Sequence, residues 1–371
     1  MATDAWLTLL HAAPPGDRRW LAALVAHGSP EALLARSRQS LVSDGLREDS
    51  VDRFKSPDMP AVQRASAWLG GANRRLVTFG SEHYPPLLAN IADPPLALWV
   101  EGPSPALLSG AQLAMVGSRN PTSGGRDTAE QFSRYLAERG LTITSGLAIG
   151  IDGASHRGAL EQIGGTIAVL GSGLDTIYPH DHTGLARSIA ERWLLVSEYP
   201  PGTKPSKHHF PQRNRIIAGL TLGTLVVEAT LRSGSLITAK LAAECGREVF
   251  AIPGSIHNPL ARGCHRLIRN GAKLVEEAAD IFVELAPQLK IDLASVPPPS
   301  RNGAHHDLPT EDPEYRKLLD TLGFEPRSIT DLIDRSGLTA AETSSMLLVL
   351  ELEGFVEALP GGRYLRVAKR D

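Results

Sequence analysis

Cysteine is scarce in this chain of 371 residues, and the sequence has neither a long apolar run nor a signal-like N-terminus. The two cysteines, Cys245 and Cys264, form no Cys-x-x-Cys pair, so the sequence predicts neither a disulfide framework nor a zinc cluster. No apolar stretch reaches membrane-spanning length, and no basic segment precedes an apolar one at the N-terminus. We therefore expect a cytoplasmic protein that does not contact a membrane.

The phosphate-binding motifs of common nucleotide enzymes are also missing. No Gly-x-Gly-x-x-Gly motif fits, because the glycines after Gly146 fall at Gly150 and Gly153, and no Gly-x-x-x-x-Gly-Lys-Ser/Thr loop occurs. The run His180-Asp181-His182 lacks further metal ligands, and Ser172 lacks the flanking residues of a catalytic nucleophile. The sequence therefore predicts no cofactor, no metal site and no catalytic residue.

Charge is unevenly distributed along the chain, although the formal net charge is only −3. From 200 to 273 there are eleven Lys and Arg residues against three Glu, a balance of +8. From 311 to 371 there are eight Lys and Arg against twelve acidic residues, a balance of −4. Such an asymmetry predicts a local site for an anionic ligand on an otherwise acidic protein.

Short apolar runs alternate with amphipathic helical patterns through the middle of the chain. The runs are LAMVG, LTITSG, TIAVLGSG, WLLVSEYP, TLVVEAT and EVFAIPG. This alternation predicts an α/β fold, a doubly wound Rossmann-like parallel sheet with helices on both faces. Between 76 and 101, four prolines favour a strand, a short helix and another strand.

The chain divides into four predicted segments. Residues 1–66 contain short amphipathic helices that loosely resemble a SAM or helix-hairpin-helix module. The extended Rossmann-like domain covers 67–286, and a Pro-rich polar linker covers 287–310. Residues 311–371 show three helical patterns and a hairpin pattern around Pro360-Gly361-Gly362, which together predict a winged helix.

Glycine-rich turns follow four of the predicted strands. They are Gly117-Ser118-Arg119, Ser145-Gly146, Gly171-Ser172-Gly173 and Ser233-Gly234-Ser235. Ligands of an open parallel sheet bind beyond the carboxyl ends of its strands, so we expect all four turns to line one crevice. The last turn leads into a helix whose free N–H groups suit a phosphate. Asp152 is placed to cap the helix after the second turn.

The segment after the fourth predicted strand interleaves cations with an aromatic residue. A Pro-rich loop carries Lys204, Lys207, Arg213 and Arg215 without an acidic residue, and Phe210 lies among them. Cations can meet the phosphates of a single-stranded nucleic acid while a ring stacks on a base. The alternative is a Pro-stiffened surface loop with solvated charges.

The predicted winged helix is acidic where a DNA-reading helix would be basic. Its third helical pattern carries Glu342, Glu351 and Glu353 and no Lys or Arg. Repulsion from phosphates would oppose entry into a DNA groove, so we expect this domain to contact protein.

Several long motifs occur in the order typical of one family. They are AMVGSRNPT, SGLAIGIDGASHRGAL, AVLGSGLDTIYP, SEYPPGTKPSKHHFPQRNRIIAGL, VVEATLRSGSLITA and VFAIPGS. Together they resemble the DNA-processing protein A family (DprA/Smf) over roughly 76–280, and the winged helix also fits. The resemblance implies a non-catalytic protein that binds single-stranded DNA, protects incoming DNA, and helps to load the RecA recombinase in natural transformation. It also implies a homodimer formed through the Rossmann-like domain.

The resemblance places phosphate and base contacts at Arg119, Lys207 and Phe210. The run Gln212-Arg213-Asn214-Arg215 and the turn Ser233-Gly234-Ser235 complete the implied pocket. The expected DNA-binding residues are therefore Gly117, Ser118, Arg119, Gly146, Gly171, Lys204, Lys207, Phe210, Arg213, Asn214, Arg215, Ser233, Gly234, Ser235 and Lys240.

Two other functions compete with single-strand binding. A nucleotide-binding hydrolase of the lysine-decarboxylase-like group would carry Pro-Gly-Gly-x-Gly-Thr-x-x-Glu near the turn after VVEAT. The turn here is Leu231-Arg232-Ser233-Gly234-Ser235, which lacks the signature glycines and glutamate. A structural adaptor would not need so many cations around four glycine-rich turns.

Overall fold

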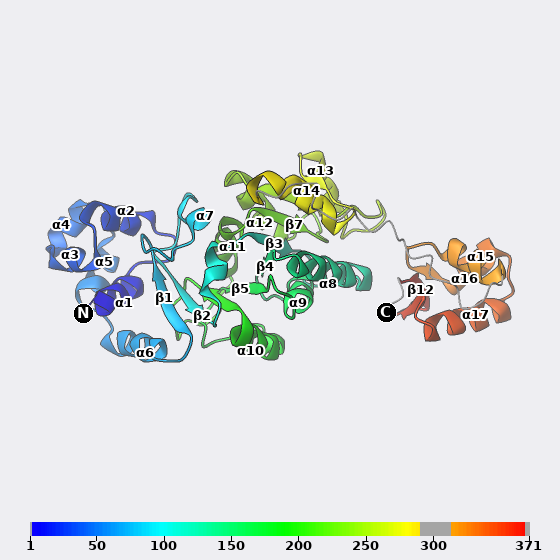
Figure 1. Ribbon diagram of the computed structural model, residues 1–371, viewed down its shortest axis with the longest axis horizontal. Coiled ribbons are helices and arrows are strands. Elements are labelled where there is room, and N and C mark those ends of the chain that lie inside the picture. The colour runs from blue at the N-terminus through cyan, green and yellow to red at the C-terminus, as the bar shows by residue number, and fades with distance from the viewer. Residues whose placement is uncertain (1, 290–312, 368–371) are drawn as a thin grey trace. The chain divides into compact units, whose positions relative to one another are not determined.

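The computed structural model describes residues 2–289 and 313–367, which belong to two compact units, 1–296 and 297–371 (Figure 1). Most of the predicted linker, 290–310, lies outside the described residues. Residues 287–289 form the last turn of a helix in the first unit. No helix in the described part of the chain combines the length and apolar character of a membrane span.

Six helices form the N-terminal part of the first unit. They are α1 (Ala2–Ala12), α2 (Arg18–His27), α3 (Pro30–Ala35), α4 (Arg38–Ser43), α5 (Glu48–Lys55) and α6 (Met59–Leu69). Side chains of Asp17, Ser29 and Asp58 accept hydrogen bonds from first-turn amides, which explains where three of these helices begin. Trp20 and Phe54 pack edge to face in their core, with ring centroids 5.1 Å apart. The predicted helical character of this segment is confirmed.

A nine-stranded sheet forms the centre of the first unit. Its strands are β1 (Arg74–Thr78), β2 (Ala97–Glu101), β3 (Gln112–Val116), β4 (Thr142–Ser145), β5 (Thr166–Leu170), β6 (Leu194–Ser197), β7 (Gly223–Val226), β8 (Glu248–Ala251) and β9 (Lys273–Leu274). The order is β1-β2-β6-β5-β4-β3-β7-β8-β9. Strands β3 to β9 pair in parallel, whereas β1 and β2 add an antiparallel edge. The predicted α/β fold is confirmed.

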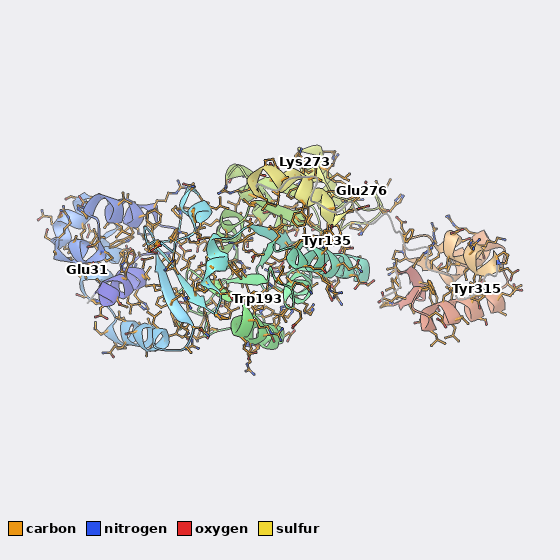
Figure 2. The ribbon with its side chains drawn as sticks, in the orientation of Figure 1. Glu31, Tyr135, Trp193, Lys273, Glu276 and Tyr315 are labelled. Atoms are coloured by element: carbon orange, nitrogen blue, oxygen red, sulfur yellow. The ribbon has the colours of Figure 1, made fainter. Side chains whose placement is uncertain are left out.

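Helices cover both faces of this sheet. They are α7 (Pro86–Ala89), α8 (Ser123–Glu138), α9 (Ile151–Ala159), α10 (Thr183–Arg192), α11 (His209–Leu220), α12 (Ser235–Glu244), α13 (Arg262–Arg269) and α14 (Ala278–Leu289), with short 3-10 turns η1 (Pro105–Ser109) and η2 (His180–His182). Leu113 and Met115 of β3 pack with α8, α9 and α14, whereas Ala114 and Val116 pack with α11 and α12. On the first face, Tyr135 of α8 meets Phe282 of α14, with ring centroids 6.4 Å apart (Figure 2 labels Tyr135).

The strand order reverses at β3, which lies between β4 and β7. The connections from β3 run one way through β4, β5 and β6, and the later strands β7 to β9 continue on the other side. A crevice forms at such a point because the two neighbouring loops leave in opposite directions. The fold therefore predicts a crevice between the turns that follow β3 and β7.

Helix α11 replaces the loop that the sequence predicts through Arg215. Pro211 lies in the first turn of α11, where a missing amide hydrogen costs no helical hydrogen bond. The following residues Ile216, Ile217 and Leu220 are buried against the sheet. The prediction of a loop was wrong because a proline near a helix start does not exclude the helix.

The second unit has the three helices and the hairpin that were predicted. Its elements are α15 (Pro313–Leu322), β10 (Arg327–Ser328), α16 (Ile329–Ser336), α17 (Ala340–Leu352), β11 (Val356–Leu359) and β12 (Arg363–Arg366). Thr339 and Glu342 form a reciprocal capping box at the start of α17. The winged helix is confirmed, with β10 as an additional short strand.

Candidate nucleic-acid interface

A crevice of about 650 Å³ opens at the reversal of the strand order. Its volume is in the range typical of ligand sites. Ten of the predicted site residues line it: Gly117, Ser118, Arg119, Lys207, Phe210, Arg213, Asn214, Ser233, Gly234 and Ser235. Five do not line it: Gly146, Gly171, Lys204, Arg215 and Lys240. The charged residues of the lining are three cations and one carboxylate, Asp152.

The turn after β3 brings Arg119 to the crevice. Gly150 has a φ of +86°, and a Cβ there would lie 2.4 Å from the carbonyl oxygen of Ser118. Glycine is therefore needed for the start of α9 to pack against this turn. The amide of Ile151 donates to the same Ser118 oxygen at 3.1 Å. Arg119 itself is exposed, and its guanidinium lies 5.6 Å from the centroid of the Phe210 ring.

The turn at Gly146 is covered by Arg213 rather than open to a ligand. The buried guanidinium of Arg213 donates to the carbonyl oxygen of Gly146 at 2.6 Å and also to that of Val169. A Cβ at Gly146 would lie 2.6 Å from Nη1 of Arg213. Burial lowers the pKa of Arg213 to about 10, so this side chain remains charged at neutral pH. Arg213 supplies positive charge to the crevice floor while carbonyls take its hydrogen bonds.

The turn at Gly171 is covered in the same way by the start of α11. A Cβ at Gly171 would lie 3.1 Å from Cδ1 of Phe210, and the His209 ring makes a 3.0 Å hydrogen bond to the Gly171 carbonyl. The expectation that all four glycine-rich turns line one crevice is therefore corrected. The turns after β3 and β7 line it, whereas side chains of α11 fill the space beside the other two.

Three buried side chains clamp the loop between β4 and α9. Asp152 accepts hydrogen bonds from the amides of Gly146 and Ala148 at 3.1 and 3.3 Å. His156 accepts from the amide of Leu147, and His182 Nδ1 donates to its carbonyl at 2.9 Å. Leu147 has a φ of 59°, an uncommon value for a branched side chain. These bonds hold the crevice floor in one shape.

One sequence expectation is changed by this clamp. Asp152 does not cap α9, whose N-cap is Gly150, because its carboxylate turns back to the loop amides. Burial raises the pKa of Asp152, and the nearby Arg213 opposes that rise. His182 belongs to the clamp, and the described residues contain no cluster of three potential metal ligands. Burial lowers the pKa of His156 to about 3, so this ring is neutral.

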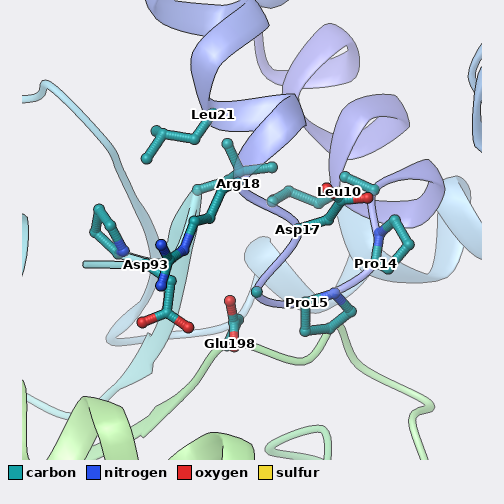
Figure 3. Close-up of a pocket in the computed structure, with 12 residues that line it drawn as sticks. Leu10, Pro14, Pro15, Asp17, Arg18, Leu21, Asp93 and Glu198 are labelled. Carbon is teal, nitrogen blue, oxygen red and sulfur yellow. The ribbon is translucent and has the colours of Figure 1, made fainter. Parts of the chain in front are cut away.

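Arg215 lies away from the crevice in a buried ion cluster. Its guanidinium pairs with Glu198 at 2.6 Å and with Asp93 at 3.2 Å, and only 6% of the side chain is exposed. A Cβ at Gly16 would lie 3.6 Å from Nη2, so the loop after α1 packs on this cluster. Figure 3 shows Asp93, Glu198 and that loop around a cavity of about 20 Å³, which has room for roughly one water molecule. Arg215 thus joins the N-terminal helices to the sheet.

The three lysines of the predicted site have different surroundings. Lys207 is exposed and lines the crevice, and the described residues include no ion pair to it. Lys204 is exposed outside the lining. Lys240 is on the outer side of α12, 76% exposed, and pairs with Glu244 at 3.5 Å. Only Lys207 therefore adds a cation to the crevice.

The N-terminus of α12 faces the crevice through the turn after β7. A Cβ at Gly234 would have no atom within 4 Å, in contrast to the filled positions at Gly146 and Gly171. The partial positive charge of a helix N-terminus favours an anion here. At α8 the corresponding place is taken by Glu228, whose carboxylate accepts from the amide and the hydroxyl of Thr122 at 2.9 and 2.7 Å. The carboxylate of Glu228 thus occupies the N-terminus of α8, the place where a Rossmann fold binds the phosphates of a dinucleotide.

Comparisons with known proteins identify the family. The family model described as DNA recombination-mediator protein A matches residues 75–286, more than half of the chain. The chain belongs to this family. A second model, the DprA winged helix domain, matches residues 302–362. The chain is 44% identical to Protein Smf of Escherichia coli over 334 residues, 89% of this chain and 87% of that protein. It is 50% identical to DNA processing protein DprA of Streptococcus pneumoniae over 201 residues, 54% of this chain and 71% of that protein.

Two solved DprA structures resemble this fold. The X-ray structure of DprA from Streptococcus pneumoniae aligns with a TM-score of 0.68 at 38% identity, covering 76% of this chain and 98% of that one. DprA from Helicobacter pylori aligns with a TM-score of 0.52 at 28% identity, covering 58% of this chain and 97% of that one. The latter structure is described as giving insight into a unique single-stranded DNA binding mode.

Some residues of the DprA-type crevice were missed in the sequence. Tyr178, Asn120 and Thr230 line it together with Ile237 and Thr238. Tyr178 belongs to the quoted run AVLGSGLDTIYP, where the Tyr-Pro pair indicated only a turn. The parallel sheet order, which local pattern does not reveal, brings these residues together.

Proposed function

We propose that this chain binds single-stranded DNA in the crevice between the turns after β3 and β7, with little sequence preference. The observation that carries the proposal is the combination of exposed Arg119 and Lys207 with the half-buried Phe210 ring in one crevice. Cations that meet phosphates and a ring that meets a base are the two elements of sequence-tolerant single-strand binding. The Helicobacter pylori relative, described as binding single-stranded DNA, supports the same assignment.

Arg119 and Lys207 are assigned to phosphates, and Phe210 is assigned to a base. Arg213 contributes charge from the crevice floor, since its donors already serve Gly146 and Val169. The open N-terminus of α12 at Gly234 offers a further place for a phosphate. Lys204 and Lys240 lie outside the crevice lining, and their charges attract the DNA strand toward this surface.

The proposal includes the finer functions that the family resemblance implies. The chain acts without catalysis in the cytoplasm, protects incoming DNA and helps to load the RecA recombinase during natural transformation. It does so as a homodimer formed through the Rossmann-like domain. The winged helix contacts protein, because α17 carries Glu342 and Glu351 without a Lys or Arg.

A nucleotide hydrolase is the alternative function. Such an enzyme needs a group that is free to activate water. Asp152 is the carboxylate in the crevice lining, and it already accepts two amide hydrogen bonds. Incubation with ATP and AMP, followed by chromatography, is therefore expected to give no turnover. Product that scales with protein and disappears in Arg119→Ala would favour the hydrolase.

Binding of oligo-dT at a series of salt concentrations tests the single-strand proposal itself. We expect affinity to fall steeply as salt rises, since counterions are released from the strand. Preference for duplex over single-stranded DNA would contradict the proposal.

A further inference from the structure

Tyr178 lies on the crevice wall beside Phe210, and the core does not need its ring. The two ring centroids are 5.7 Å apart, with 34° between the ring planes. Tyr178 is 46% exposed, whereas the preceding Ile177 packs against the core beside α10. The Tyr178 ring thus packs against Phe210 and leaves about half of its surface open at the charged crevice.

The loop that carries Tyr178 is held on both sides. Ser172 Oγ donates to the carbonyl of Thr176 at 2.7 Å, and the Asp175 carboxylate accepts from the amide of Gly202 at 2.8 Å. After the tyrosine, the bond from His182 to Leu147 fixes η2 to the crevice floor. The backbone that carries Tyr178 is therefore held in place before any ligand arrives, which lowers the entropic cost of a contact with this residue.

The two rings differ in what already covers them. Phe210 is backed by Gly171 and carries the Arg119 guanidinium at 5.6 Å from its ring centroid. No cation lies over the Tyr178 ring among the described residues, and its hydroxyl takes part in none of their hydrogen bonds. A base on Phe210 must share the site with Arg119, whereas Tyr178 offers an open aromatic surface.

We propose that Tyr178 is a second base-stacking residue, which forms with Phe210 a two-ring platform for neighbouring bases of a single strand. The inference rests on the proposed function, because it concerns the same crevice. Stacking on a ring tolerates any base, so the platform adds affinity for unpaired bases without adding a sequence preference. It also predicts weaker binding of duplex DNA, in which the base faces are already stacked.

The test compares the full-length chain with Tyr178→Ala and Tyr178→Phe, using labelled oligo-dT and an abasic strand of the same length. Loss of one stacked base predicts that Tyr178→Ala binds oligo-dT about five- to 150-fold more weakly. Its salt dependence should match wild type, since no phosphate contact is lost. Tyr178→Phe should bind as wild type does, because it keeps the ring. On the abasic strand all three proteins should bind equally.

Three results would overturn the stacking role: wild-type affinity in Tyr178→Ala, an equal loss on the abasic strand, or a loss in Tyr178→Phe as large as in Tyr178→Ala. Thermal melts accompany the measurement, and we expect unchanged stability because the ring is half exposed. Arg119→Ala distinguishes this failure from failure of the proposed function. If Arg119→Ala binds weakly and Tyr178→Ala normally, only the platform is wrong. If both bind as wild type does, the crevice is not the DNA site.

Discussion

Replacing Arg215 should destabilise the fold and leave the DNA contacts intact. Arg215→Met removes the partner of Glu198, whose carboxylate lies 2.6 Å from the guanidinium with 6% of its side chain exposed. Burial already raises the pKa of Glu198, and Arg215 opposes that rise. An uncompensated buried charge costs about 3–5 kcal/mol of unfolding free energy. Asp93 adds little to this loss, because 30% of its side chain is exposed.

A double variant isolates the interaction free energy between Arg215 and Glu198. Arg215→Met with Glu198→Leu removes both charges and should recover most of the lost stability, because no buried charge is left unpaired. Urea denaturation of the two single variants and the double variant gives the coupling free energy. Lys207→Met is the matched control, for which we expect stability within about 0.5 kcal/mol of wild type, as for an exposed side chain.

The salt dependence of DNA binding shows whether Arg215 or Lys207 contacts a phosphate. Arg215→Met should keep the wild-type salt slope for oligo-dT, whereas Lys207→Met should bind more weakly with a shallower slope. If Arg215→Met instead lost affinity and slope at unchanged stability, Arg215 would be a phosphate contact and its structural role would be refuted.

Three further predictions concern other parts of the chain. In the folded protein the pKa of His156 lies near 3, below its ordinary 6.5. The neutral ring therefore makes its full contribution to stability above pH 6.5. As the pH falls from 6.5 toward 3, the free energy of unfolding should decrease by about 1.4 kcal/mol per pH unit. Urea denaturation should show this loss in wild type and a smaller one in His156→Gln. Phe210→Ala should weaken oligo-dT binding by about 1–3 kcal/mol at an unchanged salt slope. A melting temperature that falls by several degrees at wild-type affinity would mark Phe210 as a core residue instead. A chain ending at Val296 should retain most single-strand affinity in an equilibrium binding assay, because the removed unit is acidic, and a large loss would place DNA on the winged helix.

The sheet and the winged helix could be predicted because their signals are local. Strands β3 to β6 are short apolar runs that end at, or directly before, Gly or Ser, and an amphipathic helical pattern follows each of β3, β4 and β5. The antiparallel edge formed by β1 and β2 could not be predicted from the same pattern. Its direction follows from pairing with β6, a strand far away in the sequence.

The glycines and cations of the site were only partly interpretable from the sequence. Gly146 and Gly171 make room for side chains of α11, while Gly234 faces open space, and the three look alike in sequence. Arg213 and Arg215 lie in one cationic run with Lys207, but the helix turns them toward carbonyl oxygens and a buried glutamate. Whether an arginine meets a phosphate or the protein depends on partners distant in sequence.

The most direct test of single-strand binding in the crevice is the salt dependence of oligo-dT affinity for wild type, Arg119→Ala and Lys207→Ala. We expect a log–log slope of roughly −2 to −3 for wild type, corresponding to three or four neutralised phosphates. Each variant should bind more weakly, with a slope shallower by about 0.7. A flat wild-type slope, or two variants with wild-type affinity and slope, would contradict the assignment of this crevice to single-stranded DNA.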